Sequence, residues 1–329
     1  MEVIALDRGF GNTKASVGGN TVVLQTALSR PRLIGHAAEG MKSASADVPI
    51  VSFGNGQRFA VGYGSWYSGE PVSSLDYSSL ASPEMLATMY VAVAAAINPR
   101  TKIDSALMIV GLPVPLMKNS LQFEATVESL KKVKGQHDFE ISGEQYSLNI
   151  ERIKVVAQPV GAYTNWLFGD DLKLRNGSSK VEAAVIDWGM NTLDLYGVIG
   201  DQVMDTYVGG AEVGVHKLLE RMSEDDDTGL SLAELDAKLR DGDIAPTPEQ
   251  MEYWMALLRG ALKPVMPNLK RFGVVIPTGG GALVAGDSLK SFLRERGANV
   301  YWPANPVIEN VLGLAKFGLK ELQPEWAGA

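Results

Sequence analysis

The sequence predicts a two-domain α/β protein that is built from two related halves. An apolar strand that runs into an aspartate and a glycine turn occurs at residues 3–13 and again at residues 184–192. Further strands and helices follow each copy, and the length of 329 residues fits about two domains. A repeated unit of this kind predicts a duplicated architecture with a cleft between the halves.

Composition restricts the classes of function. Lys and Arg number 30 against 38 Asp and Glu, so the formal net charge is 30 − 38 = −8, with a pI of about 5.1. This charge argues against direct nucleic-acid binding, which usually needs a basic surface. The chain has no Cys, which excludes disulfides, thiolate metal sites and cysteine nucleophiles. Its 35 glycines, against about 23 at average usage, suggest loops whose backbone approaches a ligand.

No segment predicts contact with a membrane. The N-terminus lacks the basic region and apolar run of a signal peptide. The most apolar stretch, residues 85–97, is well short of the roughly 20 residues that span a bilayer, and it is better explained as a buried helix. We therefore expect a cytoplasmic protein.

The first half begins with the strand at residues 3–6, and the Gly-Asn turn after it indicates a meander of two hairpins. Residues 29–80 are rich in Ser, Gly and Pro and predict a small, irregular excursion from the main sheet. Ser82 and Pro83 mark the start of a helix that reaches about Ile97. The remaining elements expected in this half are a strand at 106–110, a helix at 116–133, two strands near 137–156 and a helix from 158 to 168.

The second half is expected to be more helical. After the strand at 183–186 and a hairpin at 199–201, a helix is predicted at 209–222, entered through Gly209 and Gly210. The later elements expected are helices at 231–239, 248–269 and 306–322, the second of them capped by Thr247, and strands at 273–277 and 299–302.

The aspartates and glycines of the repeat suggest a phosphate site. A carboxylate at the end of a buried strand, followed by a glycine turn, lies beside backbone N–H groups that can hold phosphate oxygens. Asp7 and Asp187 occupy this position in the two copies, and both could hold the waters of a Mg²⁺ ion. Lys14 would add positive charge near the phosphates. A third glycine loop, residues 279–281, has no side chain to obstruct a base or ribose.

Each feature alone also has a purely structural explanation. Asp-Gly turns close many hairpins, and Lys14 alone would be a solvated strand residue. Gln158, beside Pro159, could simply cap a helix, and the glycines at 279–281 could allow a helix to pack closely on a strand. The order of the whole set along the chain favours the functional interpretation.

That order resembles the actin, sugar kinase and Hsp70 ATPase fold. Proteins of this fold have two phosphate loops, an adenosine loop and two connecting segments in a fixed order, here at residues 7–14, 158–163, 187–194, 278–283 and 305–318. The short chain, Gly111-Leu112-Pro113 after a strand, and Asn310-Val311-Leu312-Gly313 near the C-terminus are similar to the plasmid-segregation proteins of the ParM/StbA type.

The resemblance implies an actin-like, duplicated ribonuclease H-like fold with a nucleotide cleft between two domains. Domain I would comprise residues 1–157 plus 306–329, and domain II residues 158–305. Arg8 and Trp188 are bulky residues at variable positions of such loops, and Met190 replaces the Gly or small residue that is frequent there. The conformation of the phosphate loops is therefore left open.

The resemblance also implies a role for each site residue. Asp7 and Asp187 would orient water on Mg²⁺, and Gln158 would position the attacking water; these three form the expected catalytic set. The expected nucleotide contacts are Gly9, Gly11, Asn12, Thr13, Lys14, Gly189, Asn191, Thr192, Glu212, Lys217, Gly279, Gly280, Gly281 and Ala282, with Glu212 and Lys217 on the helix after Gly209.

The implied function is a filament-forming ATPase that uses ATP and Mg²⁺ and moves or separates DNA. It would bind itself in the filament and hold DNA through a separate adaptor protein, without direct DNA or membrane contact. The alternative is a small-molecule kinase of the same superfold, which needs a catalytic base over an acceptor hydroxyl. Asp76 and Asp104 are available carboxylates, but no acceptor signature surrounds them. A non-catalytic nucleotide-binding protein is a further alternative, because fold alone does not separate these classes.

Overall fold

The computed structural model describes residues 1–32, 47–72, 81–224 and 229–323. The chain forms two compact units. Unit 1 comprises Met1–Val110 and Asn119–Val155, and unit 2 comprises Gly111–Lys118 and Val156–Ala329.

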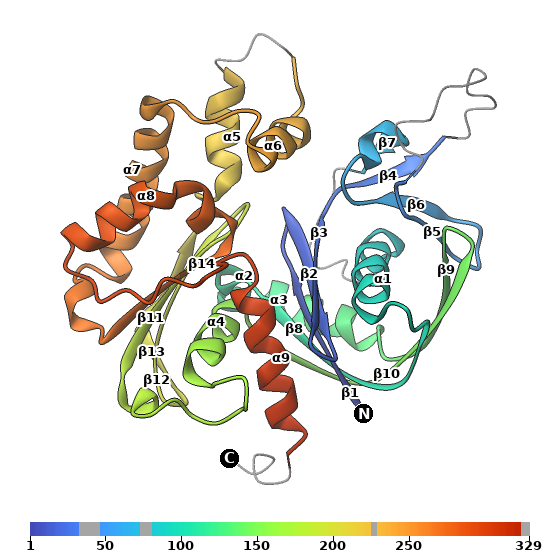
Figure 1. The fold of residues 1–329 in the computed structure, drawn as a ribbon, viewed down its shortest axis with the longest axis horizontal. Coiled ribbons are helices and arrows are strands. Elements are labelled where there is room, and N and C mark those ends of the chain that lie inside the picture. The colour runs from blue at the N-terminus through green and yellow to red at the C-terminus, as the bar shows by residue number, and fades with distance from the viewer. Residues whose placement is uncertain (33–46, 73–80, 225–228, 324–329) are drawn as a thin grey trace. The chain divides into compact units, whose positions relative to one another are not determined.

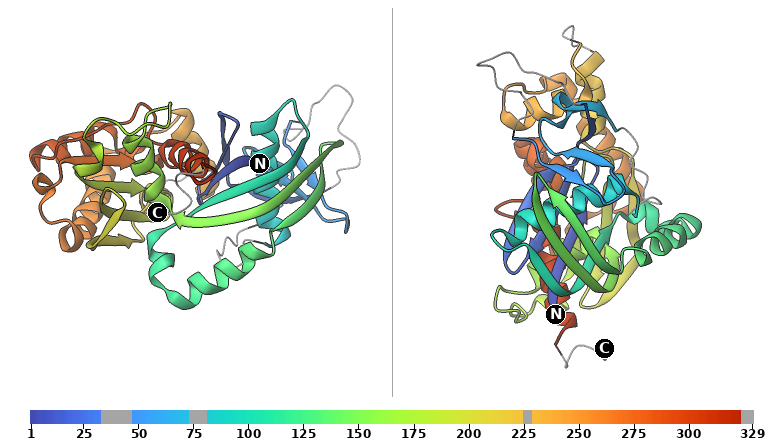
Figure 2. Two further views of the ribbon diagram at one scale, coloured as in Figure 1. Left: turned by 90° about the horizontal axis from the view of Figure 1, so that it is seen from below. Right: turned by 90° about the vertical axis from the view of Figure 1, so that its right-hand side faces the viewer.

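Unit 1 contains a ten-stranded sheet of order β3-β2-β1-β8-β10-β9-β5-β6-β4-β7 (Figure 1). Its strands are β1 (Glu2–Arg8), β2 (Asn12–Val17), β3 (Asn20–Gln25), β4 (Leu28–Pro31), β5 (Ile50–Ser52), β6 (Arg58–Val61), β7 (Gly69–Pro71), β8 (Lys102–Leu112), β9 (Gly135–Ile141) and β10 (Glu144–Ala157). The meander predicted at the N-terminus is confirmed, because β1, β2 and β3 pair antiparallel in succession. Figure 2 shows the long strands β8 and β10 curving along their length.

The predicted excursion at residues 29–80 is wrong as a description of the part that the structure describes. Val51 of β5 pairs with Ile141 of β9, so β5 joins the main sheet, and β6, β4 and β7 continue it. Short strands separated by Gly and Pro gave the sequence an irregular pattern, although their hydrogen bonds belong to one sheet. Residues 33–46 and 73–80 lie outside the described ranges.

Two helices of the first half differ in how well they were predicted. Helix α1 (Pro83–Ile97) begins as expected, with the Ser82 side chain accepting a hydrogen bond from the backbone N–H of Met85. The single helix expected at 116–133 is instead α2 (Val114–Lys118) and α3 (Ser120–Lys131). Asn119 causes the break, since it adopts φ −97° and ψ 99° and its side chain accepts from the N–H of Gln122 to cap α3.

Unit 2 contains a four-stranded sheet of order β13-β12-β11-β14. Its strands are β11 (Glu182–Trp188), β12 (Leu193–Ile199), β13 (Gln202–Ala211) and β14 (Val274–Thr278). Strands β11, β12 and β13 form an antiparallel meander, and β14 lies parallel to β11. The order repeats that of β3-β2-β1-β8 in unit 1, so the duplication predicted from the two Asp-Gly segments is present in the strand order.

In unit 2, one helix begins later than predicted, and one predicted strand is reduced to a single bridge. Besides α2, the helices of unit 2 are α4 (Gln158–Leu167), α5 (Val215–Glu224), α6 (Leu232–Asp241), α7 (Pro248–Val265), α8 (Gly279–Glu295) and α9 (Glu309–Glu321). The helix expected from Gly209 begins only at Val215, because Gly209 and Gly210 extend β13 and pair with β12. The strand expected at 299–302 is a single bridge between Val275 and Val300. Thr247 caps α7 as predicted, in a reciprocal capping box with Gln250.

Alternate residues of β11 face two separate cores. Ala184, Ile186 and Trp188 belong to the apolar cluster that β11 shares with α5, α6, α7 and α8. Ala183 and Val185 belong to the cluster that contains α4. Because successive side chains of a strand point to opposite faces, Asp187 lies on the α4 side.

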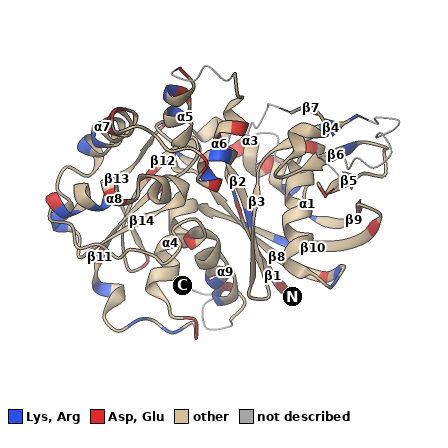
Figure 3. Ribbon diagram, turned by 45° about the horizontal axis from the view of Figure 1, so that its top comes forward, with Lys and Arg blue, Asp and Glu red and all other residues tan. Residues whose placement is uncertain are grey.

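Helices α4 and α9 pack with their backbones in contact (Figure 1). A Cβ atom on Gly313 of α9 would overlap the carbonyl oxygen of Gly161 of α4. A Cβ on Gly161 would likewise overlap the backbone of Asn310. Charged residues lie along α9 but are absent from α4 (Figure 3). The close packing therefore depends on two glycines and on polar side chains rather than on ion pairs between the helices.

One boundary of the compact units lies close to that of the predicted domains, but the units differ from the domains at Gly111–Lys118 and at the C-terminus. The predicted boundary at 157/158 lies two residues from the boundary of unit 1 at Val155. Helix α9 falls in unit 2, whereas the sequence assigned residues 306–329 to domain I. The domain assignment and the expected cleft stay predictions. In the described ranges, no helix is both long and apolar enough to cross a membrane.

Candidate functional site

The first Asp-Gly hairpin joins β1 to β2 in unit 1. Asp7 and Lys14 face each other across the hairpin, and the Lys14 Nζ donates to Asp7 Oδ2 at 2.7 Å. Both residues are buried, with Asp7 only 1% exposed. The backbone N–H of Gly9 donates to the carbonyl oxygen of Asn12, which closes the turn. The Asp7 carboxylate is thus paired with the ammonium group of Lys14.

Two threonines fix the base of this turn. Thr26 Oγ1 donates to the carbonyl oxygen of Gly9 at 2.8 Å, and the Thr26 N–H donates to the carbonyl oxygen of Gly11 at 3.0 Å. Thr13 Oγ1 lies 2.9 Å from Thr26 Oγ1 and is fully buried. The predicted contact residue Thr13 therefore uses its side chain to hold the loop.

The second hairpin joins β11 to β12 in unit 2 and repeats the first. The N–H of Gly189 donates to the carbonyl oxygen of Thr192 at 2.8 Å, as Gly9 does to Asn12 in the first copy. Asp187 is 5% exposed, and its Oδ2 accepts from Asn310 Nδ2 at 2.7 Å. The two predicted aspartates therefore occupy equivalent positions in equivalent turns.

Asp194 is a candidate site residue that sequence reasoning missed. It lies directly opposite Asp187 across the hairpin, where the first copy has Lys14 opposite Asp7. Residues opposite each other in an antiparallel pair point to the same face with Cβ atoms about 5 Å apart. Asp194 is 1% exposed. The signal was present, because Lys14 and Asp194 each follow the aspartate of their copy by seven positions.

The amino end of α5 supports the second loop. Backbone N–H groups of Gly214, Val215 and His216 donate to the carbonyl oxygens of Asn191, Gly189 and Met190, at 2.9–3.1 Å. Gly214 is required here, since a Cβ would overlap the carbonyl group of Met190. Burial lowers the pKa of His216, which favours its neutral form beside this loop.

The bulky residues Trp188 and Met190 fit the second hairpin because their side chains pack in the core. Trp188 is fully buried and lies 3.9 Å from Trp254 between ring centroids, and its Nε1 donates to the carbonyl oxygen of Val213. Met190 packs against the same core. Both side chains therefore point into the α5–α8 side of unit 2.

The predicted third glycine loop is the first turn of α8 rather than a loop, and its glycines differ in their surroundings. Gly279 has φ +88°, and a Cβ there would lie 2.7 Å from Asp187 Oδ1. A Cβ on Gly281 would lie 2.6 Å from Cγ of Trp188, whereas a Cβ on Gly280 would meet nothing. Ala282 is fully buried in the α5–α8 core. Of these four predicted contacts, Gly280 alone has open space beside it.

Gln158 is the first residue of α4 and is 7% exposed. Ala157 occupies the N-cap position, and no side chain caps the helix there. Gln158 therefore lies at the helix entry, as the structural explanation expected, but one position after the N-cap. A Cβ on Gly111 would lie 3.0 Å from Cγ of Gln158, so the absence of a side chain at Gly111 makes room for this amide.

Of the two weaker candidates, Lys217 lies on the helix as expected and Glu212 does not. Glu212 is exposed and lies between β13 and α5 rather than on a helix. Lys217 is on α5 and its Nζ donates to Glu220 Oε2 at 2.9 Å. The misplaced helix start at Gly209 explains the error for Glu212.

Sequence and structure comparisons match the chain and its fold to known proteins. Residues 5–161 match a family model described as actin like proteins N terminal domain. The structure of the actin-like protein Alp7A has a TM-score of 0.75 at 14% identity, over 99% of this chain and 97% of that chain. A 15-stranded ParM filament from Clostridium botulinum has a TM-score of 0.70 at 16% identity, over 97% and 99%. The chain has the actin-like fold.

A further actin-like match contains nucleotide. The ADP complex of Ta0583, an archaeal actin homologue, has a TM-score of 0.70 at 20% identity, over 97% of this chain and 100% of that chain. No curated protein matches the chain. The predicted actin-like fold class is thus confirmed.

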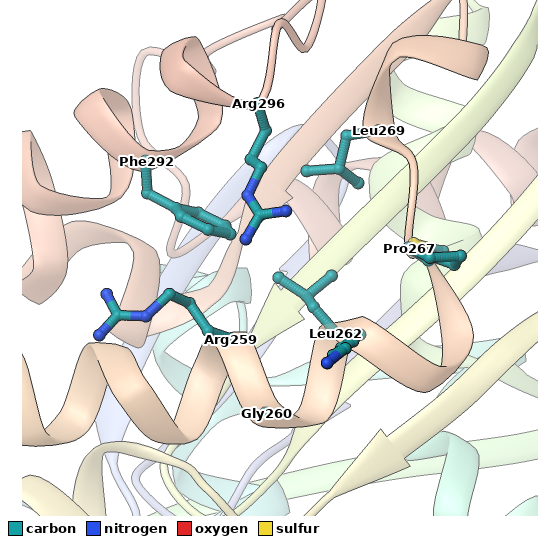
Figure 4. Close-up of a pocket in the computed structure, with 9 residues that line it drawn as sticks. Arg259, Gly260, Leu262, Pro267, Leu269, Phe292 and Arg296 are labelled. Carbon is teal, nitrogen blue, oxygen red and sulfur yellow. The ribbon is translucent and has the colours of Figure 1, made fainter.

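One pocket of this actin-like chain lies apart from the predicted nucleotide contacts. It has a volume of about 480 Å³ and lies between α7 and α8, with Arg259 and Gly260 on one side and Phe292 and Arg296 on the other (Figure 4). None of the predicted site residues lines it. In the described part of the chain, no group of three or more His, Asp or Glu side chains could hold a metal.

Proposed function

We propose that the chain is a filament-forming ATPase that hydrolyses ATP in its polymer. The observation that carries the proposal is the pair of equivalent Asp-Gly hairpins in an actin-like fold. Support for nucleotide comes from the ADP complex of the archaeal actin homologue, and support for assembly from the ParM and Alp12 filaments.

The donor set of the second hairpin fits a magnesium ion. Asp187 and Asp194 place two buried carboxylates on one face, and Mg²⁺ prefers oxygen ligands together with substrate phosphate. Bound Mg²⁺ would neutralise phosphate charge and bring ordered waters. Asp187 and Asp7 would hold those waters by hydrogen bonds, while the backbone N–H groups of the two turns bind phosphate oxygens.

Of the remaining predicted residues, some would bind the nucleotide and one would take part in hydrolysis. The Lys14 ammonium group, which is hydrogen-bonded to Asp7, would also interact with a phosphate oxygen. Gln158 would hold the attacking water, because a neutral amide donates and accepts hydrogen bonds but is a poor general base. Gly280 would give the base or ribose close access.

We further propose a role in separating or positioning DNA in the cytoplasm. The formal charge of −8 favours an adaptor protein, rather than this chain, as the DNA-binding partner. The kinase alternative gains no support from the described residues. Asp104 is exposed on β8 with its Oδ1 2.5 Å from Lys102 Nζ, and Asp76 lies outside the described ranges.

Light scattering and pelleting with ATP, ADP and a non-hydrolysable ATP analogue test the function. We expect polymer with ATP and with the analogue, and faster disassembly with ATP. Release of ADP that depends on an added acceptor, without pelleting, would instead favour a kinase. An absence of nucleotide binding would contradict both.

Gln158→Ala is expected to retain ATP affinity and ATP-dependent assembly but to hydrolyse ATP more slowly. Water positioning contributes to the in-line step and not to the holding of ATP. The polymers should therefore persist longer in a time course of light scattering, with phosphate release slowed in parallel. Unchanged phosphate release and wild-type disassembly would show that Gln158 serves only the structure.

Gly280→Val is expected to weaken ADP binding about tenfold, or about 1.4 kcal/mol, with little change in melting temperature. The open space beside Gly280 accommodates the new side chain, so the fold should not change. Gly281→Ala is the contrast, because its Cβ would press on Trp188 and lower the melting temperature. ADP affinity of Gly280→Val equal to wild type would remove Gly280 from the site.

A further inference from the structure

The Asp187 carboxylate is held by a residue from the far end of the sequence. Asn310 lies in the first turn of α9 and is 3% exposed. Its Nδ2 donates to Asp187 Oδ2 at 2.7 Å, and both side chains are buried within unit 2. A buried hydrogen bond to a charged acceptor is among the stronger kinds and limits the rotation of the carboxylate.

The other polar atom of Asn310 has no partner. Oδ1 is buried, and no hydrogen-bond donor in the described residues reaches it. A buried acceptor without a donor costs about 1–3 kcal/mol, so native proteins seldom retain one without a reason. Because Oδ1 belongs to the same small amide group as Nδ2, a donor that satisfies it would lie close to Asp187.

A purely structural explanation predicts something different. Asn165 Nδ2 donates to Glu309 Oε2 at 2.7 Å, one position earlier on α9. This neighbouring bond joins α4 to α9, and burial raises the pKa of Glu309. If Asn310 served only to pack α9, an apolar side chain of similar volume would replace it with a loss of stability alone.

We propose that Asn310 is a positioning residue, which fixes the Asp187 carboxylate and accepts a hydrogen bond through Oδ1 from a water of the bound cation. The inference rests on the proposed ATPase function and deepens it. Asn310 would act through Asp187 without touching the nucleotide. It would therefore govern the magnesium requirement and the rate of hydrolysis, and leave nucleotide affinity without magnesium unchanged.

The test compares Asn310→Leu with Asn165→Leu. Both variants replace an amide by an apolar group of similar volume in the same helix pair, and both remove a 2.7 Å bond to a carboxylate. The measurements are melting temperature, affinity for a fluorescent ATP analogue in EDTA and across a Mg²⁺ titration, and kcat normalised to nucleotide-binding sites. Mg²⁺-induced change in melting temperature without nucleotide is measured as well.

We expect both variants to melt earlier than wild type. Asn310→Leu should also need about tenfold more Mg²⁺ for tight ATP binding and lose at least about tenfold in kcat, with unchanged affinity in EDTA. Asn165→Leu should keep the wild-type magnesium requirement and kcat. Should Asn310→Leu fail to fold, Asn310→Ala replaces it with the same expected split.

Equal effects of the two substitutions on magnesium requirement and kcat would overturn the proposal. So would an Asn310→Leu magnesium requirement within twofold of wild type. A wild-type chain that binds no nucleotide contradicts the proposed function instead. In that case the thermal shift with Mg²⁺ alone decides the role of Asn310, and a shift equal to wild type in Asn310→Leu rejects it.

Discussion

Asp187→Ala is expected to abolish ATP hydrolysis and leave the fold in place. The carboxylate lies near the end of a buried strand, at the turn that we propose binds phosphate, where it would hold waters on the cation. Groups that act on transition-state charge typically contribute about 10²–10³ in kcat. The substitution also leaves Asn310 Nδ2 without its acceptor, which should cost about 1–3 kcal/mol of stability.

Phosphate release at saturating ATP, with circular dichroism as the check on folding, measures this effect. Asp187→Asn is the matched variant, because it keeps the shape of the side chain and removes the charge. Turnover of Asp187→Ala within a few-fold of wild type would refute its assignment to the site.

Gly313→Ala is expected to destabilise unit 2 strongly, although it adds only one methyl group. The new Cβ would overlap the carbonyl oxygen of Gly161 in the α4–α9 contact, and backbone atoms on both sides leave no side chain to move away. Overpacking typically costs about 1–3 kcal/mol and occasionally more, and we expect about 3 kcal/mol or more at this position. A large fall in melting temperature should accompany loss of nucleotide binding.

Gly260→Ala is the matched control for a glycine inside a helix. Gly260 lies in α7, and its Cβ would meet open space. Alanine should therefore stabilise the protein by about 0.5–1 kcal/mol, since glycine is the poorer helix former. Equal melting temperatures for Gly313→Ala and wild type would show that α4 and α9 pack less closely than the structure indicates.

The sequence could predict the two turns of the candidate site, because local patterns determine them. The two Asp-Gly turns lie at the ends of short apolar strands, and a strand, a carboxylate and a turn are all encoded within about a dozen residues. Both turns close with the same hydrogen bond, from Gly9 to Asn12 and from Gly189 to Thr192. The identities and spacing of these residues were sufficient to predict the two turns.

The parts that were missed depend on contacts between distant segments. Gly209 and Gly210 looked like a helix entrance, but their pairing with β12 makes them part of a strand. The difference between Gly280 and Gly281 appears only when Trp188 is placed beside the first turn of α8. No local pattern links Asn310 to Asp187, 123 positions earlier in the chain.

The contact between α4 and α9 reduces the number of independent movements available to the proposed catalytic apparatus. Gln158 begins α4 and Asn310 lies in the first turn of α9, and the two helices touch through backbone atoms at Gly161 and Gly313. Helices in such contact cannot slide without separating, so the two residues share one rigid body. The timing of hydrolysis would then depend on the binding of the nucleotide, the ion or a neighbouring subunit to this rigid body. It would not depend on a change in the shape of the body itself.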